Sequence, residues 1–331
     1  MSEDLCNRCG CFPSVFFRAY SGERLCRRCF NVLFEDRVQD TISRYGMLLP
    51  NDRIAVALSG GKDSASLLRV MARLEERFPK AKLLAVTVDE GIRGYRREAL
   101  ELARKNCRKL SVPHRTASFK DLFGLTLDEI LKDEARSRLG LSSCSICGIL
   151  RRRALNLLAK EVGTTKIATA HNLDDEIQTV VLNMIHGDTS RLLKLSPVSR
   201  DSPSFISRIK PFYRTPENEI ALYAFLNGIE FQSVPCPYMQ ESTRSQVRAF
   251  LNRLEVDHSG IKYTLLSSYE KIQSSVGEPV EDAYKVCRIC GETSVRDICR
   301  VCEVLPKLRD AGKRQRTAQR SAPRACGKPS S

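Results

Sequence analysis

The stretch that decides the fold reads Arg53-Ile54-Ala55-Val56-Ala57-Leu58-Ser59-Gly60-Gly61-Lys62-Asp63-Ser64. Its first six residues form a short, mostly apolar run that ends shortly before the Gly-Gly pair. Apolar residues at helical spacing then continue from Ser64 to Phe78. An apolar run, a glycine turn and an amphipathic stretch are typical of a strand, a tight loop and a helix.

The loop carries the groups that bind phosphate. Gly60 and Gly61 permit positive φ and the close approach of an anion, so main-chain N–H groups and the start of the helix can cradle its oxygens. Lys62 adds a positive charge, while Asp63 can cap the helix or hold Mg²⁺. The spacing differs from that of the Walker loop, which has four residues between its first glycine and Gly-Lys. The sequence therefore predicts a phosphate site and disfavours transfer of the γ-phosphoryl group.

Further strands and helices alternate along the chain. We predict strands at 82–88, 112–118 and 165–170, and helices at 95–110 and 174–185. After Pro211 the pattern is mostly helical, over 216–227, 242–254 and 261–273. This alternation predicts an α/β fold, in which a parallel sheet has helices on both faces and binds ligands at the carboxyl ends of its strands.

A second motif follows the strand predicted at 165–170 and opens the next helix. It reads Ala170-His171-Asn172-Leu173-Asp174-Asp175-Glu176. In a parallel sheet it lies at the same end as the glycine loop. Its paired carboxylates can hold a magnesium ion beside bound phosphates, or they can simply offset the dipole of the helix.

The composition favours a nucleic-acid partner. The 331 residues include 54 Lys and Arg against 39 Asp and Glu, a formal net charge of +15, which suits a polyanion. No apolar run reaches the roughly 18 residues of a membrane span, and the N-terminus lacks the apolar core of a secretory signal. We therefore expect a cytoplasmic protein with no membrane partner. In that compartment the 14 cysteines favour metal binding over disulfides.

Two sets of four cysteines have the spacing of structural zinc sites. Each set contains two Cys-x-x-Cys pairs, which fit a tetrahedral ion with no open position. The expected ligands of the two Zn²⁺ ions are Cys6, Cys9, Cys26 and Cys29, and Cys287, Cys290, Cys299 and Cys302. Cys11 is a spare thiol that competes with Cys9, and we assign no role to Cys107 or Cys326.

A third set differs from the other two. Cys144 and Cys147 are expected on a loop before a basic helix that begins at Arg151, and Cys236 stands alone. Three thiolates are one short of a closed zinc site, but they are enough for a 4Fe-4S cluster that leaves one iron free. A redox pair at Cys144 and Cys147 that carries sulfur as a persulfide remains the rival interpretation.

The glycine loop resembles the PP-loop of the N-type ATP pyrophosphatases. Together with the three cysteine sets and the second motif, residues 1–303 resemble the tRNA 2-thiouridine synthetases of the two-thiouridine and cytoplasmic tRNA thiolation family. The resemblance implies an adenine nucleotide alpha-hydrolase-like fold. It also implies an enzyme that uses ATP to adenylate O2 of a tRNA uridine, after which sulfur bound at the open iron displaces AMP.

The resemblance also implies which residues act. ATP would be bound by Ala57, Ser59, Gly60, Gly61, Lys62, Asp63, Ser64, Val88, Ala170 and Asp175. Catalysis would rest on Lys62, Asp63, Asp175, Cys144, Cys147 and Cys236, the three cysteines holding the 4Fe-4S cluster. Ala170 stands where members of the family often have a glycine before the histidine. Arg151 stands where some members have a lysine. The implied partners are tRNA and a ubiquitin-like sulfur carrier with a C-terminal thiocarboxylate, and we expect a homodimer or a related partner subunit.

The expected parts of the chain follow from these assignments. They are an N-terminal zinc finger at 1–34, the PP-loop catalytic domain at 35–215, its helical continuation at 216–280, a C-terminal zinc finger at 281–303 and a basic disordered tail at 304–331. The alternatives are another PP-loop tRNA-modifying ligase, a cluster-free persulfide thiotransferase, and a non-catalytic zinc-ribbon RNA-binding protein. The sequence leaves open whether the wobble or the T-loop uridine is modified.

Overall fold

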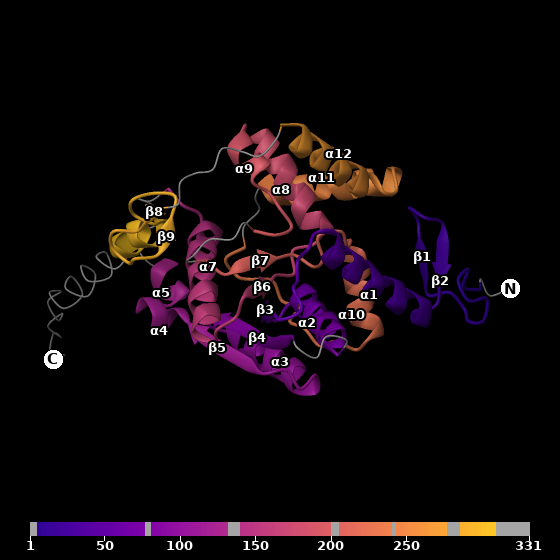
Figure 1. Cartoon of the computed structure of the whole chain (residues 1–331), viewed down its shortest axis with the longest axis horizontal. Coiled ribbons are helices and arrows are strands. Elements are labelled where there is room, and N and C mark those ends of the chain that lie inside the picture. Colours follow the sequence, from indigo (N-terminus) through magenta and orange to yellow (C-terminus); the bar gives the residue numbers. More distant parts are fainter. Residues whose placement is uncertain are drawn as a thin grey trace, which may run out of the picture.

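A five-stranded parallel sheet lies at the centre of the molecule (Figure 1). The computed structural model describes residues 5–76, 81–131, 140–199, 205–239, 243–276 and 285–308, so Cys326 and the basic stretch after residue 308 lie outside the described residues. The strands of the sheet are β3 (Arg53–Ala57), β4 (Lys82–Asp89), β5 (His114–Ser118), β6 (Lys166–Ala168) and β7 (Ser207–Ile209).

The order of the strands creates a switch point beside β3. The order is β5-β4-β3-β6-β7, and all neighbours are parallel. The chain thus builds outward from β3 through β4 to β5 and then returns to the other side of β3 for β6 and β7. The segments that follow β3 and β6 leave the sheet next to each other at the carboxyl end, which is where open sheets of this kind bind ligands.

Helices cover both faces of the sheet, as the sequence predicted. They are α1 (Arg27–Arg44), α2 (Lys62–Glu75), α3 (Arg96–Lys109), α4 (Phe119–Phe123), α5 (Leu127–Leu131), α7 (Ser143–Glu161), α8 (Leu173–Ile185), α9 (Thr189–Leu193), α10 (Glu217–Leu226), α11 (Thr243–Asp257) and α12 (Ile261–Val276). Along β3, Ile54 and Val56 belong to the hydrophobic cluster that includes α2, whereas Ala55 packs with Leu158 of α7. This alternation with period two shows that each face has its own helical layer.

The first cysteine-rich module is tied to the catalytic body by a buried carboxylate. Its hairpin consists of β1 (Phe16–Arg18) and β2 (Glu23–Leu25). Arg18 of β1 and Arg37 of α1 approach Glu219 of α10 at 3.1 and 2.9 Å, and the hydroxyl of Tyr20 donates to the same carboxylate at 2.8 Å. Because Glu219 is only 1 % exposed, removal of either arginine would leave its buried charge less fully compensated.

The second cysteine-rich module lies against α7 (Figure 1). Its hairpin consists of β8 (Lys285–Val286) and β9 (Thr293–Ser294). Glu292 pairs with Arg153 at 3.1 Å and with Lys160 at 2.9 Å. Residues 300–308 form a further helical segment that contributes Val304 and Leu308 to the hydrophobic cluster around α7, so the part of the expected tail at 304–308 is ordered instead.

Further features differ from the sequence prediction. Cys144 and Cys147 lie in the first turns of α7, not on a loop before a helix that begins at Arg151, because the side chain of Ser142 accepts a hydrogen bond from Ser145 N and starts the helix earlier. The short strand β7 was not predicted. Within the described residues, no helix combines the length and hydrophobicity that a bilayer span requires.

The turn between β3 and α2 depends on one close contact. Gly60 takes a φ of +93°, and a Cβ at this position would lie 2.8 Å from both Cβ and the carbonyl oxygen of Ala99 in α3. At the neighbouring Gly61 the nearest atom to such a Cβ is Ser59 Oγ at 3.7 Å. Of these two glycines, only Gly60 therefore combines positive φ with a site too narrow for a side chain.

We predict that Gly60→Ala lowers the free energy of unfolding by about 2 kcal/mol or more, since it adds backbone strain and a steric clash with α3. Gly61→Ala is the matched control and should leave the free energy of unfolding within about 0.5 kcal/mol of the parent value. Urea denaturation of the two variants checks this, and equal losses in both would contradict it.

Candidate functional site

The glycine loop leaves the start of α2 open for an anion. The N-terminal cap of α2 is Gly61, and no side chain caps the helix. The first N–H groups of α2 therefore have no partner within the helix. Ser59 and Ser64 lie at the two ends of the loop with their hydroxyl oxygens 2.9 Å apart, and Ser59 N donates to Ser64 Oγ at 3.1 Å. The loop is thus closed by its two serines and points free donors outward, as a phosphate site requires.

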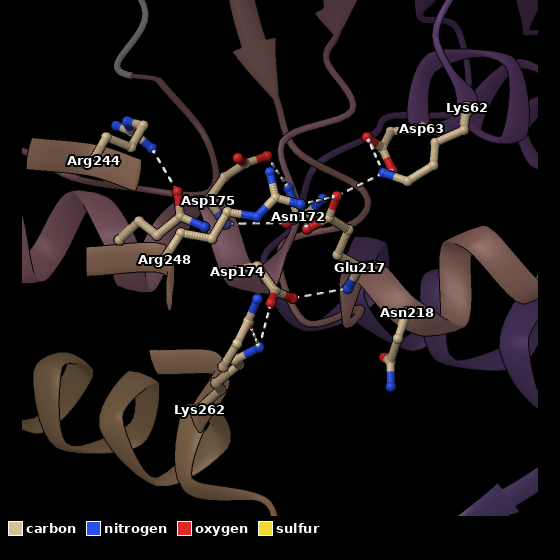
Figure 2. A network of polar contacts seen from close by, with 12 residues as sticks. Lys62, Asp63, Asn172, Asp174, Asp175, Glu217, Asn218, Arg244, Arg248 and Lys262 are labelled. Atoms are coloured by element: carbon tan, nitrogen blue, oxygen red, sulfur yellow. Dashed lines mark hydrogen bonds and ion pairs between the residues drawn. The ribbon is translucent and has the colours of Figure 1, made fainter. Parts of the chain in front are cut away.

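Charged side chains from three elements meet at this loop (Figure 2). Lys62 Nζ donates to both carboxylate oxygens of Asp63 at 3.0 Å and to Glu217 of α10 at 2.7 Å. Arg248 of α11 approaches the same Glu217 at 2.7 Å. Two cations and two carboxylates therefore form one continuous ion-pair network beside the start of α2.

The network changes the proton affinity of its members. Burial raises the pKa of Asp63 to about 6, although the charge of Lys62 opposes the rise, and the negative charges of Glu217 and Asp175 add to it. Burial also raises the pKa of Asp175. For Glu217, burial is outweighed by Lys62 and Arg248, and its pKa is lowered. Carboxyls with raised pKa values in a cluster of this kind are typical of functional sites and of magnesium ligands before the ion binds.

The second motif lies across the switch point from the loop. Asn172 caps α8 by accepting from Asp175 N at 3.0 Å, and the Asp175 carboxylate accepts from Asn172 N at 3.2 Å. Asp174 is turned away into the structure, where it accepts from Glu217 N at 2.8 Å and pairs with Lys262 of α12. The two neighbouring carboxylates thus differ in position, and Asp175 is the one that faces Asp63 closely enough to raise its pKa.

The residues expected near the nucleotide lie at one edge of the sheet. Ala57 ends β3, Val88 is the penultimate residue of β4, and Ala170 follows β6. These are three adjacent strands, so their carboxyl ends form a continuous floor next to the glycine loop.

The cysteines of the third set surround the start of α7. Cys147 is 8 % exposed, and burial raises its pKa to about 11 against the opposing charge of Arg151, whose Nη2 donates to Cys147 Sγ at 3.3 Å. Cys236 is half-buried and packs on the same hydrophobic cluster, while Cys144 is exposed. Among the described residues these three sulfurs do not all lie within 4.8 Å of one another, so they are too far apart for a single tetrahedral ion.

The other two cysteine sets are compact. In each set of four, the sulfurs lie within 4.8 Å of one another. Cys9 and Cys26 sulfurs are 3.9 Å apart, and those of Cys290 and Cys299 are 3.7 Å apart. A tetrahedral zinc ion with Zn–S bonds of 2.3 Å requires about 3.8 Å. Cys11 lies outside the first set and donates to the carbonyl of Cys9. Both sets therefore fit the geometry of structural zinc.

Several residues of the site were missed by sequence reasoning. They are Glu90, Arg96, Glu217, Arg248 and Lys262. Glu217 is in the first turn of the predicted helix after Pro216, and Arg248 lies on the predicted helix at 242–254, but their partners are more than 30 residues away in the sequence. Nothing local in the sequence indicates such pairs.

The three arginines of the basic run, Arg151 to Arg153, make different contacts. Arg151 pairs with Glu90 at 2.7 Å and Arg153 with Glu292 at 3.1 Å, so both are used within the protein. Arg152 has no ion pair among the described residues, and burial together with the charges of Arg151 and Arg191 lowers its pKa. Of the three, Arg152 is therefore the arginine whose charge no carboxylate neutralises among the described residues.

Comparison with known proteins places this geometry in a family. The PP-loop domain family matches residues 31–255. The chain is 35 % identical to "Cytoplasmic tRNA 2-thiolation protein 1" of Oryza sativa subsp. japonica, over 92 % of this chain and 83 % of that protein. It is 34 % identical to a "Probable sulfurtransferase" of Methanocaldococcus jannaschii, over 91 % of this chain and 88 % of that protein.

A solved structure is similar over almost the whole length. It is described as the "U34-tRNA thiolase NcsA from Methanococcus maripaludis with its [4Fe-4S] cluster", with a TM-score of 0.79, 34 % identity, and coverage of 94 % of this chain and 97 % of that one. The matched family, the extent of these similarities and the fold agree with one another. The chain therefore belongs to the PP-loop family and, within it, to the tRNA 2-thiolation proteins.

Proposed function

We propose that the chain is a tRNA uridine 2-sulfurtransferase that adenylates uridine O2 with ATP and then replaces the activated oxygen by sulfur, releasing AMP and pyrophosphate. One observation carries the proposal. The open start of α2, with Lys62 and Asp63, lies in the same chain as three cysteines whose spacing does not suit a zinc ion. Activation and sulfur delivery are the two steps that such a pair of sites can perform.

The glycine loop would carry out the activation. The carbonyl oxygen of uridine is a poor leaving group, and adenylation turns it into a good one. The free N–H groups at the start of α2 and the charge of Lys62 would bind the β- and γ-phosphates. Asp63 and Asp175 supply carboxylate oxygens on the two sides of the switch point, which suits a Mg²⁺ ion bound to the departing pyrophosphate.

Cys144, Cys147 and Cys236 would supply the sulfur site. A 4Fe-4S cluster held by three thiolates leaves one iron to bind an exogenous sulfur and to present it as a nucleophile. Three cysteine thiolates are the donor set that such a group requires, and the cluster named for the M. maripaludis thiolase supports the assignment. The hydrophobic residues around Cys147 would exclude water from the activated uridine.

The proposed substrate is U34 of tRNA, the position named for the M. maripaludis thiolase. Arg152 and Arg208 are the cations proposed to meet the RNA backbone, because each has its pKa lowered by burial and by neighbouring arginines, which is a sign of unneutralised positive charge. The proposed sulfur donor is a ubiquitin-like carrier with a C-terminal thiocarboxylate, and the proposed assembly is a homodimer or a pair with a related subunit. The cytoplasm is the proposed location, as the names of the relatives suggest.

We predict that Cys144→Ala abolishes 2-thiouridine formation while zinc content stays at the parent value, since Cys144 lies outside both compact cysteine sets. The protein is purified anaerobically and analysed for iron, sulfide and zinc, and nucleosides of tRNA incubated with ATP and sulfide are measured by mass spectrometry. Cys11→Ala is the control that keeps activity. Full thiolation by the Cys144 variant, or full activity of iron-free parent protein, would refute the cluster assignment, and the latter would favour the persulfide route.

Lys62→Ala is expected to reduce tRNA-dependent pyrophosphate release by at least about a hundredfold, because it removes the side-chain cation of the loop. Lys105→Ala, which removes an exposed lysine paired with Glu230, should leave the release rate unchanged. A coupled pyrophosphate assay measures both variants. Release at the parent rate in the Lys62 variant would show that the loop does not bind the phosphates.

The pH dependence should report Asp63. Because its pKa is about 6 and only the carboxylate can hold Mg²⁺, kcat/KM for ATP is expected to fall as the pH drops through about 6. Glu217→Gln removes a negative charge that raises this pKa and leaves Asp63 as the only carboxylate paired with Lys62 among the described residues, so the acidic limb should move to lower pH. Glu230→Gln is the control, and its acidic limb should stay at the pH of the parent protein. A limb that moves to higher pH in the Glu217 variant would contradict the assignment.

A further inference from the structure

A buried carboxylate, Glu90, connects the phosphate loop to the cysteine site. Glu90 follows β4 and its side chain is 3 % exposed. One of its oxygens lies 2.6 Å from Arg96 Nε and the other lies 2.7 Å from Arg151 Nε. At this depth the Glu90 carboxylate has almost no access to water, so the two arginines are the groups that compensate its charge.

Each arginine reaches onward to a different site. Arg96 donates to the carbonyl oxygen of Ser59 at 2.9 Å and to that of Val88 at 2.7 Å, so it fixes the first residue of the phosphate loop. Arg151 donates to Cys147 Sγ at 3.3 Å. The contacts therefore form a continuous path from Ser59 through Arg96, Glu90 and Arg151 to Cys147.

The two arginines of this path differ in how firmly other contacts hold them. Arg96 is 7 % exposed, and its two carbonyl acceptors would hold it even without Glu90. Arg151 is 47 % exposed, and Glu90 is its only carboxylate partner among the described residues. If the link to Glu90 were lost, the Arg151 side chain would be free to turn into water and leave Cys147.

We propose that Glu90 is a positioning residue that holds the guanidinium of Arg151 against Cys147. The inference rests on the proposed function, because it takes Cys147 to be a ligand of the cluster. A cation donating to a ligand sulfur stabilises the reduced form of such a cluster and raises its reduction potential. A lysine at position 151 has a single nitrogen, whereas the arginine fork uses separate nitrogens for Glu90 and Cys147.

Glu90→Asp tests positioning separately from charge. The shorter side chain keeps the negative charge but cannot reach both arginines. We expect it to stay paired with the buried Arg96 and to lose Arg151. We expect the reduction potential of the anaerobically reconstituted protein, followed by electron paramagnetic resonance, to fall in this variant. Arg151→Met should lower it in the same direction, and the double variant should fall no further than Arg151→Met alone. An unchanged or higher potential in Glu90→Asp, or no effect of Arg151→Met, would overturn the proposal.

A second measurement does not need the cluster. Phenylglyoxal modification of the protein purified without iron but with its zinc retained, followed by mass spectrometry, compares Arg151 with its neighbour Arg152, which has no ion pair among the described residues. Arg151 should react several-fold more slowly than Arg152 in the parent, and Glu90→Asp should remove most of that difference. Equal rates in the parent would contradict the positioning role. Parent protein that binds no iron would instead count against the proposed function, while the modification rates would still test Glu90.

Discussion

The position of β3 in the sheet is the constraint on which the site depends. Because the chain builds outward to β4 and β5 and then returns to place β6 on the other side of β3, the segments after β3 and β6 meet at the same edge. One segment brings the open start of α2, and the other brings the capped start of α8. A sheet in strict sequence order would place two strands, β4 and β5, between these two helix starts.

Residues of the C-terminal helices hold the charged side chains at this edge in place. Glu217 of α10 pairs with Lys62, Arg248 of α11 pairs with the same Glu217, and Lys262 of α12 holds Asp174. The helical continuation of the chain therefore acts as a second layer of support for the phosphate loop, and its ion pairs restrict the side chains that would contact ATP. Side chains held by such surrounding contacts lose less freedom when a ligand binds.

Much of the fold could be predicted from the sequence because its signals are local. The apolar run before Gly60, the helical spacing after Ser64 and the Cys-x-x-Cys pairs are each visible within about 20 residues, and the structure confirms the parallel sheet and the two compact cysteine sets. The predicted start of the helix at Arg151 was wrong, because the side chain of Ser142 caps α7 and starts the helix earlier, within the segment predicted to be a loop.

The ion pairs could not be predicted, since their partners come from distant parts of the chain. Glu90 and Arg151 are 61 positions apart, and Lys62 and Glu217 are 155 positions apart. The packing of α7 on the sheet and of α10 on α2 brings them together.

The central claim is that ATP activates uridine O2 before sulfur arrives. The most direct measurement follows that oxygen, in tRNA that carries ¹⁸O at O2 of the target uridine and is incubated with the anaerobic protein, ATP and sulfide. The account predicts that each 2-thiouridine formed is matched by one AMP that contains ¹⁸O. Thiolation with unlabelled AMP, or with the label in pyrophosphate or water, would contradict it.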